Sequence, residues 1–222
     1  MESKLHLEQE CDLLRLKVLE MAASCQKAIS QALQAYVDRN TEMAQEVIDN
    51  DCNINELQYT IDEKALRLMA LDQPVARDLR FVLGCTYIAS NLERVGDQAV
   101  NISERALLLA QRPALPHNPL MAELSDTAQA MLKIVIEAFN TGDPDLAQKV
   151  CEMDAKADTL NLKILTHYID YMIQESRSVE RAVHNIISAK CLERVGDLAT
   201  NIAENIIFII KGIDIRQTCR PY

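Results

Sequence analysis

Two copies of one thirteen-residue segment constrain the fold of this chain more than any other feature. Residues 92–104 read LERVGDQAVNISE and residues 192–204 read LERVGDLATNIAE, so ten of the thirteen positions agree at an offset of 100. A match at one fixed offset in the two halves of a chain is typical of a tandem duplication. The 222 residues therefore predict two similar units of about 100 residues each.

Apolar residues recur in steps of three and four through the segments around this repeat. In the first segment they are Leu7, Cys11, Leu14, Val18, Met21, Cys25, Ala28 and Ala32. This spacing places them on one face of a helix. The chain has only 5 Gly, 6 Pro and 4% aromatic residues, too few for the turns and strands of a β-sandwich or barrel. We therefore predict an all-α protein.

Breaks in the pattern divide the first half into three helices. The first break falls at Arg39-Asn40, where Thr41 is a suitable cap for the next helix. The second falls at Gln73-Pro74, because the residue before a proline disfavours the helical conformation. Residues 113–119 then hold three prolines in seven positions, which indicates a linker.

The second half repeats this plan. We expect helices over about 120–139, 145–174 and 179–211, with Asp143 capping the second and Gly212 ending the third. The prediction is two tandem three-helix bundles related by internal duplication. Their ranges are 1–112 and 120–212, with the linker over 113–119 and a C-terminal tail over 213–222.

Charge and hydropathy exclude several classes of protein. The chain has 23 Lys and Arg against 33 Asp and Glu, a net charge of −10, and no basic run, so we expect no nucleic-acid partner. The N-terminus lacks the apolar core of a signal peptide. The most apolar stretch, 206–210, is far too short to cross a bilayer. Seven widely spaced cysteines form no disulfide framework. We expect a soluble, cytoplasmic protein.

The repeated segment carries two acids and an amide at every fourth position. They are Glu93, Asp97 and Asn101 in the first copy and Glu193, Asp197 and Asn201 in the second. Four residues turn a helix by about 400°, so each set forms a near-axial row. Neighbouring carboxylates repel by a few tenths of a kcal/mol, and a mid-helix glycine, as at Gly96 and Gly196, costs up to about 1 kcal/mol. A bound cation is the simplest compensation.

The second helix of each unit supplies a matching row. It consists of Asp51 and Asn55 in the first unit, and of Asp154 and Asp158 in the second. Adjacent antiparallel helices would bring the rows together as an all-oxygen site. Such ligands favour Mg, Mn, Ca or iron and argue against Zn or Cu.

Structural explanations of the same residues remain open. Arg94 and Arg194 follow the glutamates and would neutralise the acids in solvated ion pairs. The glycines would equally allow two helices to approach closely, with the asparagines bonding across the contact.

The two segments at 92–104 and 192–204, together with DCNINEL at 51–57, IDE at 61–63 and QPVARDLR at 73–80, resemble the PhoU family. The resemblance spans nearly the whole chain and both repeats. It implies a pair of three-helix bundles that often dimerise.

The resemblance also implies a function. Members of this family act between the high-affinity phosphate ABC transporter, with its ATPase, and a sensor histidine kinase. They restrain the phosphate-starvation response and limit phosphate uptake. A soluble member would reach the membrane through these partners.

In some members, acidic motifs of the form E(D)-x-x-x-D bind metal clusters. The motifs map here onto Glu93/Asp97, Glu193/Asp197 and Asp154/Asp158, and iron, Mn or Mg would suit them. Asn55 replaces an acid, which weakens the charge of the first site. The second unit also lacks a copy of QPVARDLR.

The corner formed by QPVARDLR is the candidate for partner binding. Arg77 and Arg80 stand out there against the acidic background, and arginine favours interfaces and carboxylate recognition. The alternative is that both arginines pair with the protein's own acids.

Two other functions compete with a non-enzymatic adaptor. One is a metal-dependent enzyme that uses a carboxylate-bridged cluster, although no nucleophile or general base stands out in the sequence. The other is metal buffering, in which the cation is the cargo.

Overall fold

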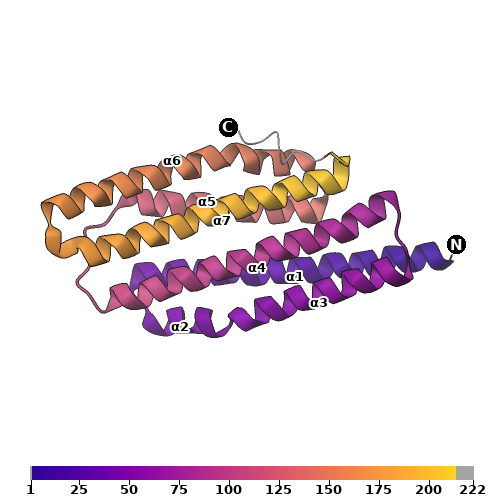
Figure 1. Ribbon diagram of the computed structural model, residues 1–222, viewed down its shortest axis with the longest axis horizontal. Helices are drawn as coiled ribbons and strands as arrows, with labels where there is room; N and C mark the ends of the chain where they lie inside the picture. Colours follow the sequence, from indigo (N-terminus) through magenta and orange to yellow (C-terminus); the bar gives the residue numbers. More distant parts are fainter. Residues whose placement is uncertain (1, 214–222) are drawn as a thin grey trace.

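The protein is an elongated assembly of long helices, seen in a computed structural model that describes residues 2–213, with side chains from His6 onward (Figure 1). About 90% of the described residues are helical. The helices are α1 (Glu2–Asp38), α2 (Thr41–Asp49), α3 (Asp51–Leu71), α4 (Ala76–Ala110), α5 (Pro119–Thr141), α6 (Pro144–Gln174) and α7 (Val179–Lys211), with a short 3-10 turn at Ser176–Ser178. The all-α prediction is confirmed.

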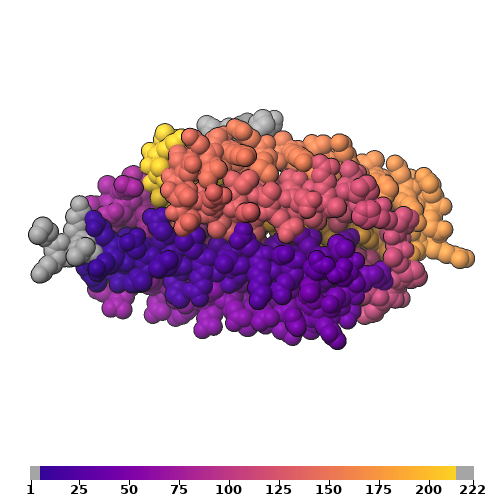
Figure 2. Space-filling model, turned by 180° about the vertical axis from the view of Figure 1, so that it is seen from behind, coloured from indigo at the N-terminus to yellow at the C-terminus, as the bar shows by residue number. Residues whose placement is uncertain are grey.

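The helices form two three-helix units that lie side by side. The first contains α1, α2 with α3, and α4, and the second contains α5, α6 and α7. Figure 1 shows α4 and α7 running antiparallel at the centre, with α3 and α6 on the outer sides. Figure 2 shows the opposite face, where α1 lies alongside the helices of the second unit. The predicted pair of tandem bundles is therefore confirmed.

The two units differ in their middle helix. In the second unit α6 runs unbroken over 31 residues. In the first unit the equivalent helix is divided at Asn50, which ends α2 and precedes α3. The Asn50 side chain donates a hydrogen bond to the Glu46 carbonyl at 2.7 Å. A short polar side chain that bonds to a carbonyl of the preceding turn competes with helix continuation, and the pattern analysis did not predict this division.

The helix ends follow the polar and glycine signals closely. Asp143 accepts bonds from the amides of Asp145 and Leu146, and Gly212 ends α7 at φ 69°. At the first break Asn40, rather than Thr41, is the cap, because its side chain accepts from the Met43 amide at 3.0 Å. The predicted tail lies outside the described residues beyond Ile213.

The two units pack together through a close helix contact at a glycine and through an arginine that lies against two phenylalanine rings. A Cβ on Gly84 of α4 would overlap the Ile209 side chain of α7, so a larger residue at position 84 would force that side chain to move. The Arg15 guanidinium lies 4.8 Å from the Phe81 ring and 5.8 Å from the Phe139 ring, joining α1, α4 and α5. No helix within the described residues is long and apolar enough to span a membrane.

Candidate functional site

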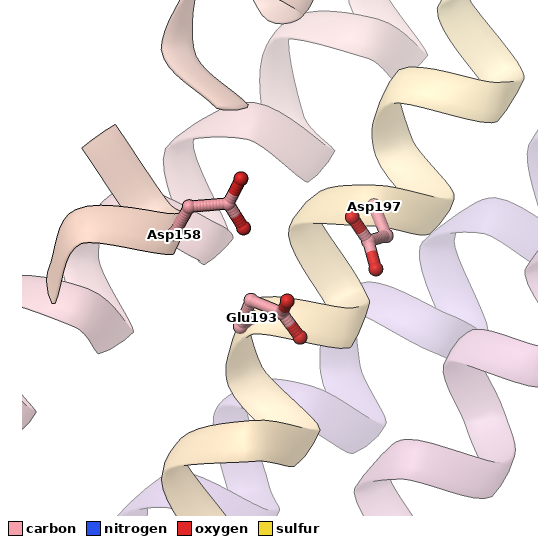
Figure 3. A group of neighbouring side chains, drawn as sticks. All are labelled: Asp158, Glu193 and Asp197. Carbon is pink, nitrogen blue, oxygen red and sulfur yellow. The ribbon is translucent and has the colours of Figure 1, made fainter. Parts of the chain in front are cut away.

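Three carboxylates converge where α6 and α7 pack together. Asp158 extends from α6 towards α7, on which Glu193 and Asp197 stand one turn apart (Figure 3). One oxygen of each side chain lies within 4.8 Å of the others. We call these residues the acid triad. Glu193 is buried, Asp197 is half-buried and Asp158 is exposed, so the triad opens to solvent on the α6 side.

A lysine ammonium lies against the triad. Lys190 Nζ is 2.6 Å from both carboxylate oxygens of Glu193, one turn away on the same helix. Burial raises the pKa of Glu193, the hydrogen bond from Lys190 lowers it, and the charges of Asp197 and Asp158 raise it further. The triad therefore already draws a positive charge to its most buried member.

The other two predicted residues of the second unit, Asp154 and Asn201, lie outside the triad. The Thr200 hydroxyl donates to Asp154 Oδ1 at 3.3 Å. Asn201 lines a pocket between α4 and α7 that also contains Tyr87, Arg94 and Glu204. Because each step of four residues drifts by about 40° around a helix, the third member of the row turns towards the neighbouring unit.

The first unit holds a weaker version of the same arrangement. Asp51 on α3 is half-buried, and burial raises its pKa, while the hydrogen bond from Asn55 Nδ2 at 3.1 Å lowers it and the charge of Asp97 raises it. Burial also raises the pKa of Glu93, with further contributions from the charges of Asp97 and Asp51. The charges of these three acids therefore influence one another, although within the described residues only the second unit meets the 4.8 Å spacing. Asn101 is half-buried one turn further along α4.

The two mid-helix glycines support the close-packing explanation. A Cβ on Gly96 would lie 3.1 Å from Ile54 Cδ1 and 3.2 Å from Asp51 Oδ1. A Cβ on Gly196 would lie 3.3 Å from Met131 Sδ. Each glycine therefore lets a neighbouring helix approach, and Gly96 also makes room for an acid of the first site.

The residues present suit a hard divalent cation. Three converging carboxylates form an oxygen donor set of the kind that Mg²⁺ and Mn²⁺ prefer. The positive charge of the Lys190 ammonium neutralises part of the negative charge that such an ion would otherwise neutralise. In the first unit, Asp51 lies at a cavity of about 160 Å³ that Lys27, Asn50 and Gly96 also line.

The two arginines of the predicted partner-binding corner lie in different surroundings. Arg77 is exposed, whereas Arg80 is half-buried, with its guanidinium 3.4–3.6 Å from the position of a Cβ on Gly212. Among the ion pairs between residues 6–213, neither arginine is paired with an acid. Leu71 and Val75 at the same corner are 69% and 73% exposed, so the corner presents apolar surface beside Arg77.

Sequence reasoning overlooked Lys190 as part of the site. The signal was available in the repeat itself, because Lys190 precedes Glu193 by three positions and Ser90 occupies the matching position before Glu93. Residues three apart on a helix share a face. Comparing the copies just outside the matching segment would have revealed this difference.

The fold and the sites define a class: a duplicated helical-bundle protein with a carboxylate-rich site in each unit. The PhoU domain profile matches residues 18–106 and 121–206. The chain belongs to the PhoU family.

Relatives match over most of their own length. The chain is 36% identical over 206 residues to the "phosphate-specific transport system accessory protein PhoU homolog" of Aquifex aeolicus, covering 93% of each chain. It is 32% identical over 211 residues to the "phosphate-specific transport system accessory protein PhoU" of Escherichia coli, covering 94% of this chain and 86% of that one.

Solved structures agree with this assignment. The crystal structure of PhoU from Pseudomonas aeruginosa superposes with a TM-score of 0.90 at 31% identity, over 93% of this chain and 99% of the other. The phosphate transport system regulatory protein PhoU from Streptococcus pneumoniae gives 0.88 at 25% identity, over 94% and 98%. These names describe accessory and regulatory proteins, not enzymes.

Proposed function

We propose that this chain regulates phosphate uptake and phosphate-starvation signalling as a cytoplasmic, non-enzymatic adaptor. It connects the ATPase of a phosphate ABC transporter to a sensor histidine kinase and restrains the phosphate regulon when phosphate is plentiful. The observation that carries the proposal is the match of both units to the PhoU domain, together with relatives named as phosphate-specific transport system accessory proteins.

The exposed corner between α3 and α4 is the partner-binding surface in this proposal. Arg77 supplies a positive charge there, beside the exposed side chains of Leu71 and Val75. Exposed apolar side chains with a neighbouring arginine are typical of an interface. Arg80 contributes indirectly, because it packs the start of α4 against Gly212 at the end of α7.

Cation binding belongs to the same proposal. The acid triad in the second unit, and Asp51 with Glu93 and Asp97 in the first, hold divalent cations such as Mn²⁺, Mg²⁺ or iron on oxygen ligands. A cation there joins the middle helix of each unit to its third helix, which stabilises the surfaces presented to partners.

The protein acts as a homodimer.

Affinity capture from phosphate-replete cells tests the adaptor role. A tagged copy, expressed in a bacterium that lacks its own family member, is expected to retain the transporter ATPase and the sensor kinase and to restore repression of a phosphate-starvation reporter. Arg77→Glu should reduce both captures while leaving the circular dichroism spectrum unchanged.

The second unit offers a matched control for that variant. Arg177 is exposed at the equivalent corner, 100 positions further along the chain. Arg177→Glu makes the same charge change and should leave capture intact. Failure of the wild-type protein to retain either partner, or to repress the reporter, would contradict the adaptor role.

A further inference from the structure

Lys190 is placed to oppose cation binding at the acid triad. Its ammonium lies 2.6 Å from both oxygens of the Glu193 carboxylate, so it covers the side of Glu193 that a metal would use. The Glu193 side chain is only 9% exposed. A metal ion and the ammonium compete for this carboxylate, because two positive charges at such short range repel each other.

The ammonium can also leave without disturbing the fold. The Lys190 side chain is 57% exposed, and a lysine stem is flexible enough to carry its charge into water. Lys156 shows that a nearby lysine need not contact the triad. It lies two positions before Asp158 on α6, but it pairs with Glu123 at 3.0 Å.

The first unit lacks this arrangement. Ser90 stands at the position of Lys190, and Asn55 stands at the position of Asp158, 103 residues earlier. The second unit therefore has one more acid at its site and one more cation in contact with it. The added lysine offsets the added acid.

We infer that Lys190 is a tethered counter-cation, displaced when a divalent cation binds the acid triad, and that it lowers the cation affinity of the second unit. This inference rests on the proposed cation binding. Loading the triad releases the Lys190 ammonium from Glu193 into solvent. The bound and free states of the site thus differ in a charge at the surface of α7.

Mn²⁺ titration followed by electron paramagnetic resonance tests the effect on affinity. The measurements use the full chain carrying Glu93→Gln and Asp97→Asn, which disable the first site without changing side-chain size. Adding Lys190→Ser copies the first unit and should tighten Mn²⁺ binding by about 1.5- to fivefold, the range expected for loss of one partly exposed ion pair. Adding Lys156→Ser instead removes the same charge nearby and should leave the affinity unchanged.

Amine labelling supplies a second readout that does not depend on affinity. Acylation followed by mass spectrometry should show greater labelling of Lys190 when Mn²⁺ is bound and equal labelling of Lys156. Equal Mn²⁺ affinities in the three proteins, or unchanged Lys190 labelling, would overturn the inference about Lys190 and leave cation binding standing. Absence of Mn²⁺ binding in all three would overturn the proposed cation site itself.

Discussion

The two acid sites occupy matching places in the two units, yet they differ in the residues that face the shared row of acids. The α4 and α7 rows keep the same glutamate and aspartate, whereas the middle helix presents Asn55 in one unit and Asp158 in the other. In the first unit Asn55 bonds to Asp51, and in the second Asp158 completes the triad. Duplication has therefore preserved the scaffold, while single substitutions on the facing helix have given two sites of different charge.

The source of positive charge differs as well. In the second unit it is Lys190, from the same helix as Glu193 and Asp197 and in direct contact with Glu193. In the first unit Lys27 of α1 lines the cavity at Asp51, and its matching position in the second unit is Ala130. The two sites therefore need not bind the same cation with the same affinity.

Exchanging the residues of the facing helix should have the largest effect. Asp158→Asn removes one carboxylate of the triad and should weaken Mn²⁺ binding to the second unit by roughly 10- to 100-fold. Asn55→Asp adds a carboxylate beside Asp51 and should tighten binding to the first unit. Calorimetric titration measures both. Equal affinities in these variants and the wild type would show that the facing residue does not distinguish the sites.

Replacing each mid-helix glycine by alanine should destabilise the protein more in the first unit than in the second. In Gly96→Ala the new Cβ meets the branched side chain of Ile54 and the Asp51 carboxylate at 3.1–3.3 Å, so we expect a loss of about 1–2 kcal/mol after the gain in helix propensity. In Gly196→Ala the nearest atoms belong to the adaptable Met131, and the change should stay within about 0.5 kcal/mol of the wild type. Urea unfolding measures the free energy of unfolding of both variants. A larger loss in Gly196→Ala than in Gly96→Ala would contradict this prediction.

The turns that open the middle helices provide a third comparison. Arg39 has φ 57°, and its guanidinium donates to the carbonyls of Leu109 at 2.7 Å and Ala110 at 3.1 Å at the end of α4. Arg39→Ala keeps the left-handed conformation, loses these charge-assisted bonds, and should cost about 1–2 kcal/mol. At the matching turn, Gly142→Ala meets no atom within 4 Å and should cost about 1 kcal/mol through its φ of 67° alone. The melting temperatures of the two variants rank these losses. An Arg39→Ala variant that melts at a higher temperature than Gly142→Ala would show that the hydrogen bonds of Arg39 do not stabilise the turn.

Loss of one ion pair between the first and middle helices of the first unit should have the smallest effect. Lys64 of α3 lies 2.7 Å from Glu10 of α1, and its hydrogen bond lowers the pKa of Glu10 from the ordinary value of 4.5. The pair therefore stabilises the fold above pH 4.5, and this contribution is lost as the pH falls through the lower, folded pKa. Lys64→Met should cost a few tenths of a kcal/mol at pH 7 and less at about pH 3, because protonation of Glu10 weakens the pair. Unfolding curves at the two pH values test this, and an equal cost at both would exclude the ion pair as its cause.

Long, regular features of the sequence predicted most of the fold. The predicted third helix of the second unit, 179–211, coincides with α7, because apolar steps of three and four run its whole length and Gly212 ends it. Asp143 before Pro144 likewise marked the start of α6. The division at Asn50 was missed because it depends on one side chain bonding to the preceding turn, which leaves no gap in the apolar pattern.

The sequence predicted which acids line up along each helix. It did not predict which side chains contact one another across helices. Spacing alone put Asn201 in line with Glu193 and Asp197, whereas helical drift takes it to the pocket between α4 and α7. The separate surroundings of Arg77 and Arg80 depend on the end of α7, more than 130 residues away along the chain. Such contacts between distant segments are set by tertiary packing, which periodicity does not encode.

Anomalous diffraction from crystals grown with Mn²⁺ locates the ion and the Lys190 side chain in one measurement, so it tests cation binding and lysine displacement together. We expect a peak bound by oxygens of Asp158, Glu193 and Asp197, with Lys190 Nζ turned away from Glu193, and a weaker peak near Asp51, Glu93 and Asp97. Absence of a peak among the triad, with Lys190 still in contact with Glu193, would contradict this expectation.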